Sequence, residues 1–500
     1  MDAAAAFPIE PPIRRCLPAT RQLGYHPCQS LGTIEIQRLA TFAIGKVRKG
    51  RDMGYRNYGG NIGGINHWLF AQKDFEHIIE RSFRKEKYTR VINGSGVVKG
   101  EQKYPQGYQD VLIPELSRRS EFIGQIPALK SIKPAEHKVL TVLVGDKDDP
   151  AVAASRSYVG MKSNTTQRAG LGSLVEELPS TTTAAEMQQK LAGWNQDPAI
   201  SILMFQLPFG GQAGKTIDTT ALCNRIELSK DGDGLNQKTL GLMSLGAERY
   251  YDCCTPRGML DLASVYLQRD KGVALRPDGF ASFGGYEVAV SGRSNIVGEP
   301  LFNLLKRLDA TALGPFHTRT GSGGKRDRET QKRIYTELSQ RADIVFSCMG
   351  FHPYNLHPDT EYFFTADMLK PGCLIIDAAT SFRKDGKRPF GDVDPPARAK
   401  ADAYTLETGG VGPATVTKLV HQGWRGMLYQ HPAEVRQALQ DEKPRVVAAF
   451  AKLLAAYAGA AEADAEDNAA TLFARAVDGD SHPVHAVDAL ELILPELMEG

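Results

Sequence analysis

The sequence lacks the features that direct a protein to a membrane or to nucleic acid. It has no run of about 18 uninterrupted apolar residues, the length that crosses a bilayer. The nearest run, 446–461, carries Lys452 and is typical of an Ala-rich amphipathic helix. The 60 basic and 58 acidic residues leave a formal net charge of +2, so no global field attracts nucleic acid or anionic lipid. These absences favour a small substrate, no nucleic-acid partner and no membrane-spanning segment.

The cysteines also lack the pattern of a disulfide framework or a zinc site. Their number is odd, and none has the C-x-x-C spacing of zinc ligands. Reduced thiols fit a reducing compartment, so we expect a cytoplasmic or mitochondrial protein rather than a secreted one. Residues 11–51 hold several Arg and Lys and one acidic residue, which suits a transit segment, although the prolines and the preceding Asp2 and Glu10 count against it. The cysteines are Cys16, Cys28, Cys223, Cys253, Cys254, Cys348 and Cys373.

The length predicts more than one domain, because single cores rarely grow beyond roughly 250 to 300 residues. Residues 1–87 show little hydrophobic period and are predicted to be an N-terminal extension of unknown role. Two α/β domains are predicted at 88–250 and 251–409. Residues 441–500 are predicted to form a helical, Ala-rich C-terminal extension.

Short apolar runs rich in β-branched residues predict the buried strands of these domains. Polar stretches long enough to cross a sheet face precede the later runs, which is typical of parallel strands joined by helices. The predicted fold class is therefore α/β, with a doubly wound sheet of the Rossmann type in the second domain. The predicted strands are Val139–Val144, Ser201–Phe205, Val288–Val290, Ile344–Phe346 and Cys373–Asp377.

A strand, a tight turn and a helix follow one another from Val288 to Lys306, which is the opening of a βαβ nucleotide site. The first residues of a helix leave N–H groups unpaired, and their dipole attracts a phosphate. Ser294 stands where the middle glycine of the usual motif would be, so the turn alone is equally compatible with a purely architectural role. The cofactor-binding candidates in it are Gly292, Arg293, Ser294, Val297 and Gly298.

The end of the next predicted strand carries His317-Thr-Arg-Thr320. A hydroxyl or guanidinium group there can meet the 2′-phosphate of NADP, whereas NAD sites usually offer a carboxylate to the ribose. Thr318 and Arg293 are the candidates for that contact, and Arg319 is a further cofactor-binding candidate. The alternative is a solvated basic loop, so the pattern favours NADP over NAD without excluding NAD.

The pair Tyr158 and Lys162 could form a proton-handling site, because a spacing of four places both side chains on one helix face. Lysine is a poor base near its free pKa of about 10.4, so burial or a non-ionic hydrogen-bond partner must lower that pKa. Gln206, at the end of a predicted strand, could be that partner. The same spacing is also common on solvated helix faces, so the pair needs supporting context.

The segment Lys230-Asp-Gly-Asp-Gly234 predicts a turn that presents Asp231 and Asp233, with glycines that permit positive φ. A carboxylate there could accept two hydrogen bonds from an aminopyrimidine ring. An EF-hand beginning at Asp231 would need Glu at its twelfth position, which is Leu242, so calcium is not supported. No metal is expected.

From about Val91 to Val420 the chain resembles the bifunctional methylenetetrahydrofolate dehydrogenase/methenyltetrahydrofolate cyclohydrolase family. Motifs in series are far more specific than any one of them. They are Val142-Leu-Val-Gly-Asp146, Tyr158-x-x-x-Lys162, Gln206-Leu-Pro208, Lys230-Asp-Gly-Asp-Gly234, Thr255-Pro-Arg-Gly258, Gly292-Arg-Ser-Asn-Ile-Val-Gly-Glu-Pro300, Ala342-Asp-Ile-Val345, Gly391-Asp-Val-Asp394 and Gly409-Gly-Val-Gly-Pro-Ala-Thr415.

The resemblance implies specific roles for the matching residues. Tyr158 and Lys162 would flank the one-carbon centre of the folate, Gln206 would hold Lys162, and Asp233 would grip the pterin. The catalytic candidates are therefore Lys162, Tyr158 and Gln206. The substrate-binding candidates are Asp233, Tyr158, Pro208, Gly412 and Pro413.

The resemblance also implies the reaction and the assembly. A hydride would leave 5,10-methylenetetrahydrofolate for NADP, and water would open the methenyl product to 10-formyltetrahydrofolate. Residues 88–250 would be the folate-binding catalytic domain, completed by a helix within 410–440, and 251–409 would be the NAD(P)-binding domain. Homodimers are usual in the family.

Departures from the family pattern affect loops rather than the proposed catalytic residues. Gly232 stands where Val is common, and Cys253 stands where Pro is common. Two other functions remain open from the sequence. A short-chain dehydrogenase also uses Tyr-x-x-x-Lys, but its Gly-rich turn comes first in the chain. The second alternative is a binding or regulatory scaffold that has lost catalytic activity. The retained Lys162 and Asp233 argue against this alternative.

Overall fold

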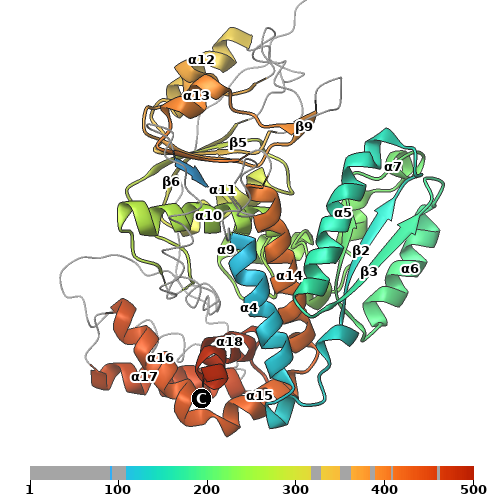
Figure 1. Cartoon of the computed structure of the whole chain (residues 1–500), viewed down its shortest axis with the longest axis vertical. Helices are drawn as coiled ribbons and strands as arrows, with labels where there is room; N and C mark the ends of the chain where they lie inside the picture. Colours follow the sequence, from blue (N-terminus) through green and yellow to red (C-terminus); the bar gives the residue numbers. More distant parts are fainter. Residues whose placement is uncertain are drawn as a thin grey trace, which may run out of the picture.

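The computed structural model describes residues 90–92, 108–276, 278–316, 328–349, 362–382, 389–406, 409–458 and 462–499. Two parallel β-sheets lie on either side of a central set of long helices, and a further group of helices gathers at the C-terminal end (Figure 1). Within these residues, no helix combines the length and the hydropathy that crossing a bilayer demands.

The smaller sheet has the order β3-β2-β4, and all its strands are parallel. The predicted strands at 139–144 and 201–205 are confirmed as β2 and β4, which are almost wholly buried. α5 packs on β2 and β3, and α6 packs on β4. The bounds are β2 Lys138–Val144, α5 Pro150–Arg168, β3 Gly172–Leu178, α6 Ala184–Gln196, β4 Ile200–Gln206, α7 Ala213–Thr216, α8 Thr219–Cys223 and α9 Gln237–Leu245, with short 3-10 helices η1 Pro127–Leu129, η2 Pro134–Glu136 and η3 Leu228–Lys230.

The larger sheet has the order β1-β11-β8-β7-β5-β6, again with all strands parallel. The chain passes from β5 to β6 on one side and returns to β7 on the other, so the strand order reverses at β5. The carboxyl end of β5 is therefore the topological switch point, where doubly wound sheets bind ligands. The bounds are β5 Glu287–Ser291, α11 Gly298–Arg307, β6 Thr311–Phe316, α12 Arg328–Ser339, β7 Ile344–Ser347, η5 Ala366–Met368, β8 Leu374–Asp377, β9 Ser381–Phe382, β10 Pro389–Phe390, α13 Pro395–Lys400 and β11 Ala403–Thr405.

The first strand, β1 (Arg90–Ile92), lies at the edge of the larger sheet, where it pairs with β11. The sequence-based boundary at residue 88 had assigned these residues to the first domain. The prediction differs from the structure because pairing with a strand so far along the chain is a tertiary contact, and the pattern of a short strand does not specify its partner.

The helices α4, α10 and α14 pack together between the two sheets, and α14 also contacts α5 and β4. Every residue of α14 except Gly412 is buried. Beyond α14, α18 packs on α14 and α4, where a buried ion pair joins Arg425 to Asp488 at 2.6 Å and a buried hydrogen bond of 2.5 Å joins His421 to Glu491. The bounds are α4 Tyr108–Ile123, α10 Cys254–Lys271, α14 Val411–Tyr429, α15 Pro432–Asp441, α16 Lys443–Ala458, α17 Glu462–Val477 and α18 Val484–Glu499.

Candidate active site

Tyr158 and Lys162 lie on one face of α5, as their spacing predicts. The Nζ atom of Lys162 is 4.8 Å from the centroid of the Tyr158 ring. Lys162 is buried, with 4% of its surface exposed, whereas Tyr158 is half-buried. The Tyr158 hydroxyl lies 3.4 Å from the carbonyl oxygen of Gly412, at the start of α14. The phenol thus joins α5 to α14, and the amine lies beneath its ring.

Gln206, the last residue of β4, gives Lys162 an uncharged hydrogen-bond partner. The Lys162 amine donates to Gln206 Oε1 at 2.9 Å, and Met204 Sδ lies 3.4 Å from the same nitrogen. The Gln206 Nε2 group donates to the carbonyl oxygen of Leu207 at 3.2 Å, which keeps the amide oxygen directed at Lys162. Burial lowers the pKa of Lys162, and the negative charge of Asp233 partly opposes that effect. Lys162 therefore loses its proton at a lower pH than an exposed lysine does.

The two acidic residues of the 230–234 turn have different environments. Asp231 is fully buried and accepts hydrogen bonds from the backbone N–H groups of Leu235 and Asn236 and from the Thr239 hydroxyl, at 3.1, 3.0 and 2.8 Å. Those bonds hold the turn together. Asp233 is only half-buried, and burial raises its pKa while the nearby Lys162 amine lowers it. Asp233 is thus the partly exposed carboxylate of the turn.

The remaining substrate-binding candidates border this group. Pro208 is exposed and directly follows Gln206 and Leu207 at the end of β4. Gly412 is half-buried and Pro413 is buried, both in the first turn of α14. The structure therefore brings together candidates that are more than 250 residues apart in the chain, since the Tyr158–Gly412 contact spans 254 positions.

The Gly292 turn is a tight connection between β5 and α11 that depends on two glycines. Gly292 has φ +82°, and a Cβ atom on it would come within 2.6 Å of the Cys348 carbonyl oxygen. A Cβ atom on Gly298 would lie 1.9 Å from the Gly292 carbonyl oxygen, so only glycine allows α11 to begin there. Arg293 and Ser294 are exposed, and Val297 is half-buried. The turn offers open backbone and a cation at the switch point of the larger sheet.

Buried polar groups fix the backbone opposite that turn. Asp392 accepts hydrogen bonds from the Ser347 hydroxyl at 2.6 Å and from the Met349 backbone N–H at 2.9 Å. The Cys348 N–H donates to the Ser291 hydroxyl at 3.2 Å. The carboxyl ends of β5 and β7 are therefore held side by side. Thr318 and Arg319, the other cofactor-binding candidates, lie outside the described residues.

Sequence reasoning missed the groups behind the Asp233 turn. The Cys254 thiol lies 3.2 Å from the Gly232 carbonyl oxygen, and Gln422 of α14 contacts both of these groups. Cys254 directly precedes the Thr255-Pro-Arg-Gly258 motif, which could have drawn attention to it. Gln422 lies in no motif, and its contact with Gly232 spans 190 positions.

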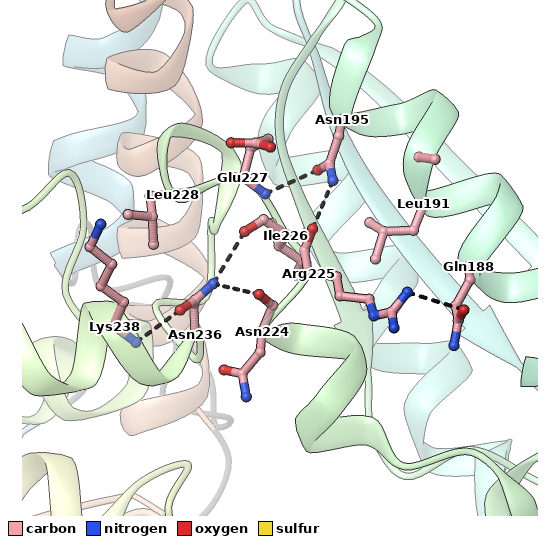
Figure 2. A pocket seen from close by; sticks show the side chains of 11 residues that line it. Gln188, Leu191, Asn195, Asn224, Arg225, Ile226, Glu227, Leu228, Asn236 and Lys238 are labelled. Atoms are coloured by element: carbon pink, nitrogen blue, oxygen red, sulfur yellow. Dashed lines mark hydrogen bonds between the residues drawn. The ribbon is translucent and has the colours of Figure 1, made fainter.

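A separate cavity of about 620 Å³ lies between α6 and the 224–238 segment (Figure 2). Its polar groups are largely bonded to one another: Asn195 donates to the Arg225 carbonyl oxygen at 2.8 Å, and Asn236 donates to the Ile226 carbonyl oxygen at 3.2 Å. Among the described residues that line it, none is a candidate for the site above. It does not belong to the Lys162 site.

Two family models match the chain. The catalytic domain of tetrahydrofolate dehydrogenase/cyclohydrolase matches residues 117–233, and the NAD(P)-binding domain of the same family matches residues 253–431. The helices α15–α18 lie wholly beyond both matched ranges, since α15 begins at Pro432.

Relatives of known name are similar over most of their own length. The bifunctional protein FolD of Teredinibacter turnerae is 34% identical over 304 residues, covering 61% of this chain and 91% of that protein. The FolD protein of Bacillus subtilis is 32% identical over 281 residues, covering 56% of this chain and 83% of that protein.

Solved structures share the fold. A Trypanosoma brucei N5,N10-methylenetetrahydrofolate dehydrogenase-cyclohydrolase, in complex with an NADP cofactor and an inhibitor, has a TM-score of 0.53 and 23% identity, and the match covers 68% of this chain and 98% of that one. The Campylobacter jejuni FolD enzyme has a TM-score of 0.52 and 22% identity, with 68% and 99% covered.

Proposed function

Since the chain belongs to the tetrahydrofolate dehydrogenase/cyclohydrolase family, we propose that it oxidises 5,10-methylenetetrahydrofolate and hydrolyses the resulting 5,10-methenyltetrahydrofolate to 10-formyltetrahydrofolate. The observation that carries this proposal is the buried Lys162 amine, bonded to the uncharged Gln206 beside Tyr158 and Asp233. A non-enzymatic scaffold would have no need to bury a lysine against an amide, because such burial costs stability.

Each residue of the group has a distinct task in this proposal. The Asp233 carboxylate accepts hydrogen bonds from the aminopyrimidine part of the pterin, and the Tyr158 ring positions the folate over Lys162. Pro208, Gly412 and Pro413 border the substrate. Gln206 holds the amine of Lys162 in place without adding a negative charge that would stabilise its protonated form.

The hydrolytic step needs a base, and Lys162 can supply it. Water adds to the methenyl carbon while the free amine of Lys162 takes a proton from it. The bond from that carbon to N5 then breaks, N5 takes a proton, and the O–H proton of the intermediate is lost as the formyl group forms. One proton is released overall, which balances the positive charge of the methenyl substrate.

A nicotinamide dinucleotide fits the Gly292 turn, because glycine at 292 and 298 lets the chain fold closely on itself there, where a Cβ atom at either position would clash with a backbone carbonyl oxygen. When bound, it accepts the hydride from the methylene carbon. Gly292, Ser294, Val297 and Gly298 would hold the diphosphate near the start of α11. We propose NADP rather than NAD, because the exposed Arg293 offers a cation for a 2′-phosphate, and Thr318 and Arg319 are proposed to add to it.

The domain limits and assembly remain part of the proposal. Residues 88–250 without β1, together with α14, would form the folate domain, 251–409 the NAD(P) domain, and 441–500 an extension. A homodimer follows from the family resemblance, and light scattering of the purified protein would measure it. A cytoplasmic or mitochondrial location follows from the cysteine pattern.

The proposed activities are tested by following NADPH and methenyltetrahydrofolate absorbance together on methylenetetrahydrofolate. Wild type should form NADPH and then consume the methenyl product. Titration with each dinucleotide should give a lower KM for NADP than for NAD, and Arg293→Ala should narrow that difference. A folded wild-type protein that turns over no methylenetetrahydrofolate with either dinucleotide contradicts the proposal and favours a scaffold.

A further inference from the structure

The side-chain amide of Gln422 joins separate segments behind the candidate site. Its Nε2 group donates to the Gly232 carbonyl oxygen at 2.7 Å and lies 3.0 Å from Cys254 Sγ. Its Oε1 atom accepts the backbone N–H of Asp252 at 3.1 Å. Gln422 is buried on α14, so one amide ties that helix to the Asp233 turn and to the start of α10.

The turn is held from its other side by β4. Gly232 N–H donates to the Leu203 carbonyl oxygen at 3.3 Å, and a Cβ atom on Gly232 would come within 2.6 Å of Ile202. The family commonly has Val at this position, and the turn here lies too close to β4 for any side chain. The peptide that precedes Asp233 is thus fixed between β4 and α14, and Gln422 is its contact on the α14 side.

Cys254 completes the arrangement. Its thiol lies 3.2 Å from the Gly232 carbonyl oxygen, next to the Gln422 amide, and it is fully buried. Burial raises the pKa of the Cys254 thiol well above its ordinary value, so it remains a neutral group beside Asp233. The carbonyl of Gly232 therefore receives two donors, one from α14 and one from α10.

We propose that Gln422 is a positioning residue, which sets the Asp233 carboxylate for the pterin by holding the Gly232–Asp233 peptide. This inference rests on the proposed function. Gln422 touches neither substrate nor cofactor and acts only through Asp233. Because a pterin-binding carboxylate contributes equally to ground state and transition state, its misplacement should raise KM for folate and leave kcat nearly unchanged.

The test replaces the amide by an isosteric apolar side chain, Gln422→Met, in the full-length protein. KM for methylenetetrahydrofolate should rise about tenfold, as expected for the loss of a buried hydrogen-bond partner, while kcat and KM for NADP stay within about twofold. In an Asp233→Asn background the same change should leave KM for folate almost unaltered, because the two residues act as one unit.

The matched control is Gln430→Met, on the same helix. Gln430 also donates its amide to a backbone carbonyl, that of Ile200, at 2.8 Å, but it lies at the opposite end of α14 from Gly412. It should lower the melting temperature without raising KM for folate. Should Gln422→Met fail to fold, two variants of Cys254 test the hold on the same peptide. Cys254→Ala removes a donor to the Gly232 carbonyl oxygen and should raise KM for folate. Cys254→Ser keeps a donor there and should have a KM for folate close to that of wild type.

The inference is overturned if Gln422→Met behaves as Gln430→Met does, or if its effect persists in the Asp233→Asn background. In the fallback, equal KM values for Cys254→Ala and Cys254→Ser overturn it. A wild-type protein without folate turnover refutes the proposed function and this inference together, whereas an active wild type with an unaltered Gln422→Met refutes this inference alone.

Discussion

Lys162 and Lys418 are equally buried, with 4% and 3% of their surfaces exposed, but they have opposite kinds of partner. The Lys162 amine faces the amide oxygen of Gln206 at 2.9 Å. The Lys418 amine lies 2.5 Å from the Asp261 carboxylate. Burial lowers the pKa of both lysines. For Lys418, the negative charge of Asp261 is the largest effect that raises the pKa again. The partner, not the burial, distinguishes a lysine suited to proton transfer from one that holds helices together.

The surroundings of the two lysines agree with this difference. Asp261 also accepts the Tyr108 hydroxyl at 2.6 Å, so the Lys418 cluster joins α4, α10 and α14 with its charge matched. Lys162 lies instead beside Tyr158 and near Asp233, which are both only half-buried. Such a site costs stability, as functional sites often do.

The largest expected effect comes from removing the amine of Lys162. Lys162→Met should reduce hydrolysis of methenyltetrahydrofolate by about 10²- to 10⁴-fold, the usual contribution of a positioned base. Absorbance of the methenyl compound measures this directly. Lys418→Met is the control, since it removes an equally buried lysine, and its folded fraction should hydrolyse at the wild-type rate. An equal loss of hydrolytic activity in Lys162→Met and Lys418→Met would contradict the different roles assigned to the two lysines.

Removing the amine of Lys418 should affect stability instead. Lys418→Met removes the cation nearest to the buried Asp261 carboxylate, leaving only the longer contact of 3.9 Å to Arg257, and should cost about 3 kcal/mol in the free energy of unfolding. The double variant Lys418→Met with Asp261→Leu should recover much of that loss, because no unmatched charge remains. Urea denaturation of the single and double variants provides the comparison, and a single variant as stable as wild type would contradict the assigned role.

The substitution Gln206→Glu gives Lys162 a carboxylate partner, like the one that Lys418 has in Asp261. A carboxylate at the position of Gln206 Oε1 should raise the pKa of Lys162 and keep it protonated at neutral pH. Hydrolysis at pH 7 should then fall roughly 10- to 100-fold and recover as the pH rises, whereas Gln206→Met should not show that recovery. The pH profile of hydrolysis is the measurement. A profile for Gln206→Glu that parallels wild type would contradict the argument.

The sequence specified the local parts of this site better than its supports. The β-branched runs predicted β2, β4, β5, β7 and β8, because a buried parallel strand needs that composition. The spacing of Tyr158 and Lys162 fixed their common helix face, because helical geometry is local. These features depend on residues that are neighbours in the chain.

The supports could not be predicted because they come from distant segments. Gln422 contacts Gly232 across 190 positions, and β1 pairs with β11, which lies more than 300 residues later in the chain. Residue type alone did not distinguish Asp231 from Asp233, and the choice of Asp233 came from the family resemblance. The hydrogen bonds from Leu235, Asn236 and Thr239 show that Asp231 is the carboxylate that holds the turn together. A sequence pattern gives residue types and their spacing. Which side chains contact each other across distant segments can be assigned only from the folded structure.

The smallest effect concerns the stability cost of Lys162. Burial lowers its folded-state pKa below the ordinary value of 10.5, so between the lowered pKa and 10.5 the unfolded chain binds more protons than the folded one. Stability contributed by this group therefore rises with pH through that window, and at pH 7 the group is unfavourable. Lys162→Met should raise the free energy of unfolding by about 1 kcal/mol at pH 7, and the gain should shrink toward pH 10. Thermal unfolding at both pH values measures it. A gain that is independent of pH would mean that packing, and not the charge of the amine, accounts for the cost.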